Sequence, residues 1–198
     1  MLVLGLLTRL GLAGPAAVDP ERFARTMEGW REFYLMSGTA AVTLAGLLFV
    51  SMSFNMGHLL HDSRAHLLRF ARNTMLVYVV VLLMSLMMLV PHLPPTGLAL
   101  QIAALGVMLT VLSSAAMVRL VRDPDASFSR RHRLRRSLTP IVAGVLMVLA
   151  TPGIAHGDPD TFFMLVGSVC LLLASAVWSS WDLLVGVARA RRDGATAD

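Results

Sequence analysis

The sequence predicts an all-α integral membrane bundle of five transmembrane helices, with the N-terminus outside and the C-terminus inside. Two observations carry this prediction: five long apolar stretches, and an arginine count that alternates between the gaps that separate them. Lipid offers the backbone no hydrogen-bond partner, so each apolar stretch is expected to be helical. The stretches run over residues 33–54, 74–90, 97–118, 138–151 and 162–181.

Composition supports the same class. Hydrophobic residues make up 56% of the 198 residues, charged residues only 15%, and mean hydropathy is +0.70. Soluble domains average about 45–50% apolar residues. The net charge of +5 comes from arginine alone, because the chain contains no lysine. These arginines flank apolar spans, so anionic lipid headgroups are the expected partner and nucleic acid is not. The single cysteine, Cys170, excludes a disulfide within the chain.

The length of each apolar stretch, together with the prolines and glycine near its ends, defines each predicted span. About 20 residues, at ~1.5 Å each, cross a hydrocarbon core of ~30 Å. The first, third and fifth stretches have that length, and the second has 17 uncharged residues before Pro91. The fourth is the shortest, with Pro140 in its first turn and Pro152-Gly153 predicted to end it. We expect this helix to be short or to use flanking residues.

Arginine counts predict the orientation. The gaps after the first and third stretches carry three and seven arginines, the C-terminal tail carries three, and the other two gaps carry none. The positive-inside rule assigns the arginine-rich side to the cytoplasm. The predicted parts are an outer tail with an interfacial helix (1–32), the transmembrane domain (33–187) and a cytoplasmic tail (188–198). The predicted lipid-headgroup contacts are Arg130, Arg131, Arg133, Arg135 and Arg136.

Residues at the ends of the predicted bundle give separate predictions for the N-terminal segment and for the membrane interfaces. Residues 1–14 are apolar but too short to span, and a misplaced start codon, a surface-lying segment and a cleaved signal remain open. Residues 19–31 read as a helix approaching the membrane, with Phe23, Met27 and Trp30 on one face. The predicted interfacial residues are Trp30, Tyr34, Trp178, Trp181 and Asp182. For Asp182, an exposed carboxylate and a partner of Arg69, Arg72 or Arg136 are both open.

Small residues recur every four positions in the first span. Such spacing lets another helix approach closely, within the chain or in an oligomer. The alternative is a pore lined by the hydroxyls of Ser37, Thr39, Thr43, Ser51 and Ser53, although such hydroxyls can equally bond their own backbone. The predicted packing or pore-lining residues are Ser37, Gly38, Thr39, Ala41, Thr43, Ala45 and Gly46.

Few residues in the sequence are candidates for metal binding or catalysis. His58, His61 and Asp62, with His66, would share a face if residues 57–72 were helical, and could hold a transition metal. An amphipathic helix on the membrane surface explains the same segment. His92, His156, Asp158 and Asp160 occupy the two predicted outer loops without a metal-ligand spacing. No charged residue or histidine lies in the middle of a span, which disfavours proton-coupled transport and bis-histidine haem. We expect no cofactor and no catalytic centre, since phosphate-binding and nucleophile motifs are missing.

Two sequence blocks, in and beside the first and last spans, resemble those of a protein family. Trp30, Phe33-Tyr34, Gly38, Ala40-Ala41, Thr43-Leu44, the run from Gly46 to Val50, Ser53 and Asn55 match one block. Ser179-Ser180-Trp181-Asp182-Leu183-Leu184-Val185 matches a second, with two small-residue substitutions. In these blocks the chain resembles a family of small multi-span bacterial inner-membrane proteins. The resemblance implies a multi-pass protein of the bacterial cytoplasmic membrane and no particular activity.

The sequence therefore favours a non-catalytic accessory, scaffolding or regulatory protein that packs against other membrane helices, as a homo- or hetero-oligomer. Two alternatives stay open. One is a homo-oligomeric ion channel lined by the first span, and the other is a membrane metal protein or enzyme that uses His58, His61 and Asp62.

Overall fold

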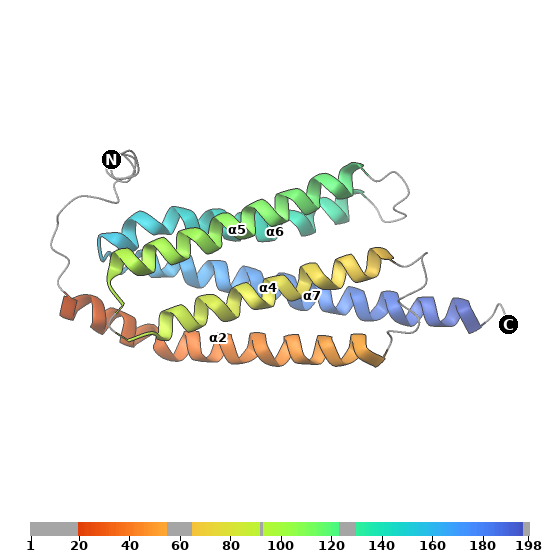
Figure 1. Ribbon diagram of the computed structural model, residues 1–198, viewed down its shortest axis with the longest axis horizontal. Coiled ribbons are helices and arrows are strands. Elements are labelled where there is room, and N and C mark those ends of the chain that lie inside the picture. The colour runs from red at the N-terminus through yellow and green to blue at the C-terminus, as the bar shows by residue number, and fades with distance from the viewer. Residues whose placement is uncertain (1–19, 55–64, 92, 123–129, 196–198) are drawn as a thin grey trace.

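Five α-helices make up the fold of the computed structural model, which describes residues 20–54, 65–91, 93–122 and 130–195 (Figure 1). In these residues all five helices are long and apolar enough to cross a membrane. The predicted all-α membrane bundle of five spans is confirmed. The helices are α2 (Pro20–Phe54), α4 (Ala65–Leu89), α5 (Pro95–Arg122), α6 (Arg130–Ala155) and α7 (Thr161–Ala195).

Consecutive helices run antiparallel, so α2 begins at one end of the bundle and α7 finishes at the other (Figure 1). The most extensive contacts join α5 to α6, α2 to α4 and α6 to α7. Because α7 also packs on α4, these two helices run through the middle, with α2 on one side and the α5–α6 pair on the other. We call the end where α2 begins the N-terminal end and the opposite one the C-terminal end.

The core lies where α4 and α7 meet their neighbours. Val81 and Met84 of α4 and Leu165 and Leu172 of α7 are fully buried. The outermost helix is α2, since only 28% of its most apolar stretch is buried, against 39–44% in the other four spans. Large side chains on its remaining surface, such as Phe49 and Met36, face away from the bundle. In a membrane this surface meets lipid or another protein.

The first helix is longer than its predicted span. The interfacial helix predicted at 19–31 and the span predicted at 33–54 form one continuous helix from Pro20 onward. At ~1.5 Å per residue, 35 residues extend about 50 Å, well beyond a hydrocarbon core of ~30 Å. Phe23 in its first turns is buried and packs on Phe162 at the start of α7, with ring centroids 6.1 Å apart. This ring contact packs the polar turns of α2 against the N-terminal end of the bundle.

The fourth span does not end at Pro152-Gly153, as the sequence predicted, but continues to Ala155. Proline lacks only its own amide donor, and the carbonyl of Pro152 still accepts a hydrogen bond from the amide of His156 at 3.1 Å. The residue that turns the chain out of the helix, two residues after Ala155, is Gly157, whose φ is 71°. The amide of Gly157 donates to the carbonyl of Ile154 and that of Asp158 to Gly153, which is the Schellman pattern of a helix C-terminus.

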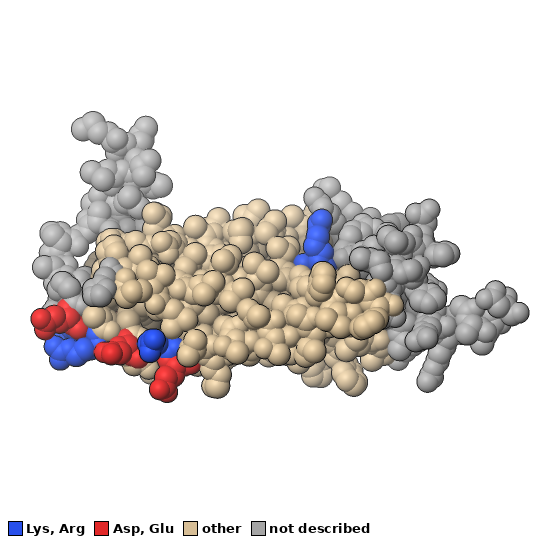
Figure 2. Space-filling view, turned by 60° about the horizontal axis from the view of Figure 1, so that its bottom comes forward, with Lys and Arg blue, Asp and Glu red and all other residues tan. Residues whose placement is uncertain are grey.

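On the face drawn in Figure 2, acidic and basic side chains gather at the N-terminal end, and basic atoms lie towards the opposite end. Between them the visible surface is a broad belt without charged side chains, as the bilayer core requires. Arg122 ends α5 and Arg130 begins α6 at the C-terminal end of the bundle. The backbone positions of Arg72 and Arg189 lie in the parts of α4 and α7 nearest the same end. The fold therefore gathers the arginine-rich segments at one end, and the assignment of that end to the cytoplasm stays a prediction.

Candidate functional site

The small residues predicted to pack in α2 lie on two opposite faces. Ser37, Gly38 and Ala41 are buried towards the bundle, and Ala45 is half-buried beside them. Thr39, Thr43 and Gly46 are exposed on the other side. One face of α2 is therefore used inside the chain, and the other is left open.

The inner face is built on a close approach of α2 and α4. A methyl group on Gly38 would lie 2.9 Å from the Cβ atom of Ser85, so only glycine permits this distance. The hydroxyls of Ser37 and Ser85 lie 3.2 Å apart, and the Ser37 hydroxyl also donates to the carbonyl of Tyr34 at 3.2 Å. Ser85 can thus donate to Ser37 while Ser37 donates to its own helix. This face works as intramolecular packing.

The outer face has its polar groups satisfied locally. The hydroxyl of Thr39 donates to the carbonyl of Leu35 at 2.8 Å, and that of Thr43 to Thr39 at 2.9 Å. Ser53 bonds the carbonyl of Phe49 at 3.0 Å in the same manner. The hydroxyls proposed to line a pore therefore do not share one face, because Ser37 points inward and these three point outward.

Gly46 is the exposed glycine of this outer face. A methyl group added there would meet nothing within 4 Å, in contrast to Gly38. Glycine within a helix costs about 0.5–1 kcal/mol relative to alanine. Nothing in the described part of the chain makes use of the space that Gly46 leaves.

A shallow, open groove follows the outer face from the polar turns into the apolar part of α2. All of its lining residues belong to this one helix. They are Glu32, Leu35, Met36, Thr39, Ala40, Thr43 and Leu44. The groove is mostly apolar, with a carboxylate at its N-terminal end.

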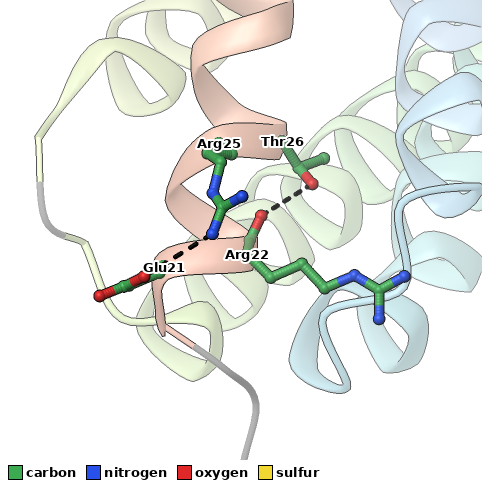
Figure 3. A network of polar contacts seen from close by, with 4 residues as sticks. All are labelled: Glu21, Arg22, Arg25 and Thr26. Atoms are coloured by element: carbon green, nitrogen blue, oxygen red, sulfur yellow. Dashed lines mark hydrogen bonds and ion pairs between the residues drawn. The ribbon is translucent and has the colours of Figure 1, made fainter.

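The polar turns of α2 contain an ion pair and a side-chain hydrogen bond to the backbone (Figure 3). A guanidinium nitrogen of Arg25 lies 3.6 Å from a carboxylate oxygen of Glu21, and the hydroxyl of Thr26 donates to the carbonyl of Arg22 at 3.1 Å. The next two acids, Glu28 and Glu32, are exposed and make no ion pair in the described part of the chain. They are four residues apart on the helix, and Glu32 lines the N-terminal end of the groove.

The predicted interfacial aromatics have different environments. Trp178 and Trp181 are exposed near the C-terminal end, with 67% and 66% of their surface accessible, and Asp182 beside them is half-buried. Trp30 packs edge-on against Phe163 of α7, with ring centroids 5.1 Å apart. Tyr34 is buried, and its hydroxyl has no hydrogen-bond partner among the described residues. These aromatic contacts between α2 and α7 were not anticipated from the sequence, since neither span shows which helix will lie beside it.

The proposed metal ligands His58, His61 and Asp62, and His92, lie outside the described residues. Within the described ranges no group of three or more metal-binding side chains comes together. At the α6–α7 link, Nδ1 of His156 lies 2.6 Å from the carbonyl of Pro152, and Asp158 accepts a hydrogen bond from the amide of Asp160 at 3.1 Å. These two side chains contribute to the helix end and the turn that follows it.

The arginines predicted to contact headgroups lie in the first turns of α6, and no acidic residue accompanies them there. The backbone of these turns is helical, and the side chains lie outside the described residues. A helix N-terminus carries a partial positive charge, so a run of basic residues at this place is favourable only beside anions.

These features define a multi-span helical membrane protein. No protein-family model matches the chain, and comparisons with curated proteins and with solved structures found no match. The likeness to a bacterial inner-membrane family accordingly stays a prediction drawn from the residues themselves.

Proposed function

We propose that this protein is a non-catalytic accessory or scaffolding subunit that acts by lateral association in the membrane, through the outer face of α2. The single observation that carries the proposal is Gly46, an exposed glycine on the least buried of the five spans, where a methyl group would meet nothing within 4 Å. Gly167 of α7 has the same free space but is half-buried, on a more buried span. Contacts between membrane helices favour small residues, which let two backbones approach closely. A surface that meets only lipid gains nothing from glycine.

The exposure of α2 supports the same function. It is the least buried of the five spans, and its outer hydroxyls already bond their own backbone. A partner helix can therefore cover this face without leaving a hydroxyl unsatisfied. An aqueous pore would gain less from hydroxyls that are engaged in this way.

The test is the mass of the protein and its complexes in nanodiscs made from native membranes. Gly46→Leu should abolish association, because a large side chain holds the partner away, and it should leave the fold intact. The matched control is Gly167→Leu on α7, since a methyl group there also meets nothing within 4 Å. Association that survives Gly46→Leu, or is lost equally with Gly167→Leu, would refute the proposal. A rotationally symmetric ring of copies that conducts ions would favour the channel instead.

We further propose that the basic first turns of α6 bind anionic lipid headgroups. The support is the run from Arg130 to Arg136 at a helix N-terminus that has no acid of its own. Replacing Arg130, Arg131 and Arg133 by glutamine should reduce the number of anionic lipids retained in native mass spectra. Unchanged retention would contradict this contact.

A further inference from the structure

The polar turns of α2 lie level with an apolar part of the other helices. Trp30 packs on Phe163 of α7 with ring centroids 5.1 Å apart, so the two residues lie at one height along the bundle. Thr161 at the start of α7 lies against Gly153 of α6, where an added methyl group would collide with it. Counting ~1.5 Å per residue from that contact places Leu149 of α6 within about one turn of the height of Phe163.

Leu100 of α5 lies at the same height as Leu149. The backbones of Gly106 and Gly144 touch, and the two leucines lie five or six residues from that contact, towards the N-terminal end. Both leucines are open to the surroundings, with 66% of Leu100 and 60% of Leu149 exposed. At this height the α5–α6 side of the bundle therefore presents a surface that suits hydrocarbon.

The α2 side presents charge at that height. Glu28, Arg31 and Glu32 lie within one turn of Trp30, and all three are exposed. Figure 2 shows the consequence: at the N-terminal end, uncharged surface lies beside charged side chains over the same length of the bundle. Charged groups are costly in hydrocarbon. A membrane edge at right angles to the helices would therefore leave either these charges in lipid or the leucines of α5 and α6 in water.

The opposite end is displaced in the same direction, beginning with α2. Phe54, the last residue of this helix, is 85% exposed. It follows Gly38, which lies level with Ser85 of α4, and the hydroxyl of Tyr78 on α4 lies 3.1 Å from that of Ser180 on α7. Counting residues from these contacts places Phe54 about 13 Å beyond Ser180, towards the C-terminal end.

The basic turns of α6 lie well short of that height. The backbone of Arg136 precedes Gly153 by 17 residues, and Gly153 is level with Thr161. Arg136 is therefore within about one turn of the height of Ser180. Exposed apolar surface on α2 thus continues about 15 Å past the basic residues on the other side of the bundle.

We propose that the lipid-contacting surface of this protein is an oblique belt, so that the bundle lies tilted by about 30° in the bilayer. The belt is displaced by about 10–15 Å between the α5–α6 pair and α2. These lie on opposite sides of α4 and α7, two helix spacings or about 20 Å apart. The displacement has the same direction at both ends, whereas a bilayer thinned beside α2 would move only one edge.

The length of α2 agrees with this tilt. From Glu32 to Phe54 the helix rises about 33 Å, and a tilt of about 30° reduces its projection on the membrane normal to about 29 Å. A hydrocarbon core is ~30 Å thick. The inference concerns how the bundle meets lipid and does not depend on the partner of α2.

The test compares the depth of two spin labels at one height on opposite sides of the bundle. Single cysteines replace Glu28 or Leu149 in a Cys170→Ser background, and the protein is placed in nanodiscs of phosphatidylcholine and phosphatidylglycerol. Oxygen collects in hydrocarbon and a nickel chelate stays in water, so the ratio of their relaxation effects gives depth. We expect the label at residue 149 to lie about 10 Å deeper than that at residue 28. Equal depths would show an upright bundle and overturn the proposal.

A second measurement changes the belt itself. Polarised infrared spectra of the amide I band in supported bilayers report the mean helix tilt. Replacing Glu28, Arg31 and Glu32 together by leucine extends the apolar surface of α2 towards the N-terminal end, so the tilt should fall by about 15°. The matched control, Thr39→Leu with Thr43→Leu, adds leucines inside the belt and should leave the tilt unchanged. An equal fall in both variants would contradict the proposal, and the label depths decide it if the triple variant unfolds.

Discussion

Gly106 of α5 and Gly144 of α6 bring two helix backbones into direct contact. A methyl group on Gly106 would lie 2.9 Å from the carbonyl oxygen of Gly144, and one on Gly144 would lie 2.9 Å from the carbonyl oxygen of Gly106. The added methyl on Gly144 would also collide with the Thr110 hydroxyl, which donates to the carbonyl of Gly106 at 2.7 Å. Neither side of this contact can accept a side chain without moving a helix. The contact lies within the most extensive helix pair of the bundle.

Gly106→Ala should therefore destabilise the protein by about 1–3 kcal/mol, the usual cost of forcing an extra carbon into a packed contact. The measurement is thermal unfolding in detergent. Gly167→Ala is the matched control: it adds the same methyl group where nothing lies within 4 Å. It should be neutral or stabilising by up to ~1 kcal/mol. Equal melting temperatures for the two variants would show that the contact is looser than described.

The hydroxyl pair Ser37–Ser85 should contribute a modest coupling between α2 and α4. Hydrogen bonds between membrane helices average about 0.6 kcal/mol in double-mutant cycles. We expect a coupling of that size from Ser37→Ala, Ser85→Ala and the double variant. Ser85→Leu should cost much more, because its side chain would meet the backbone at Gly38. The cycle is measured by reversible unfolding in mixed micelles, and strictly additive single effects would argue against the hydrogen bond.

Two buried tyrosines should respond in opposite directions to loss of the hydroxyl. Tyr34 has a buried hydroxyl without a partner in the described residues, whereas the hydroxyl of Tyr78 lies 3.1 Å from that of Ser180. An unsatisfied buried polar group costs about 1–3 kcal/mol, and a satisfied one contributes about 1 kcal/mol. Tyr34→Phe should raise the melting temperature and Tyr78→Phe should lower it. A lower value for Tyr34→Phe would reveal a partner for its hydroxyl.

Membrane orientation can be tested with single cysteines in a Cys170→Ser background. Asp160 is exposed at the α6–α7 link, and the C-terminus follows the opposite end of α7. If the arginine-rich end is cytoplasmic, Asp160→Cys should react with an impermeant maleimide in intact cells. A cysteine placed after Asp198 should react only after permeabilisation. The reverse pattern would invert the predicted orientation.

Several features could be read from residue order because each depends on local chemistry. Five apolar stretches had to become helices, since lipid leaves their backbone groups no other partner. The error at Pro152 has a local cause too: a proline near a helix end removes one hydrogen bond, and the left-handed residue that ends the helix, Gly157, comes five positions later.

The division of α2 into two faces could not be read in this way. Ser37, Gly38, Thr39 and Gly46 are all small, and their spacing allows any of them to face a neighbour. Only the position of α4 decides that Gly38 lies against Ser85 while Gly46 remains open. The same holds for Gly106 and Gly144, which lie on separate helices and meet only once α5 and α6 pack.

For this chain, order along the sequence determined how many times it can cross a bilayer and where its charges collect, because solvation by lipid acts on each segment separately. Tertiary structure alone decided which helix lies outermost and which of its faces is left exposed. Packing is a property of pairs of helices, and no single segment contains the information about its neighbour.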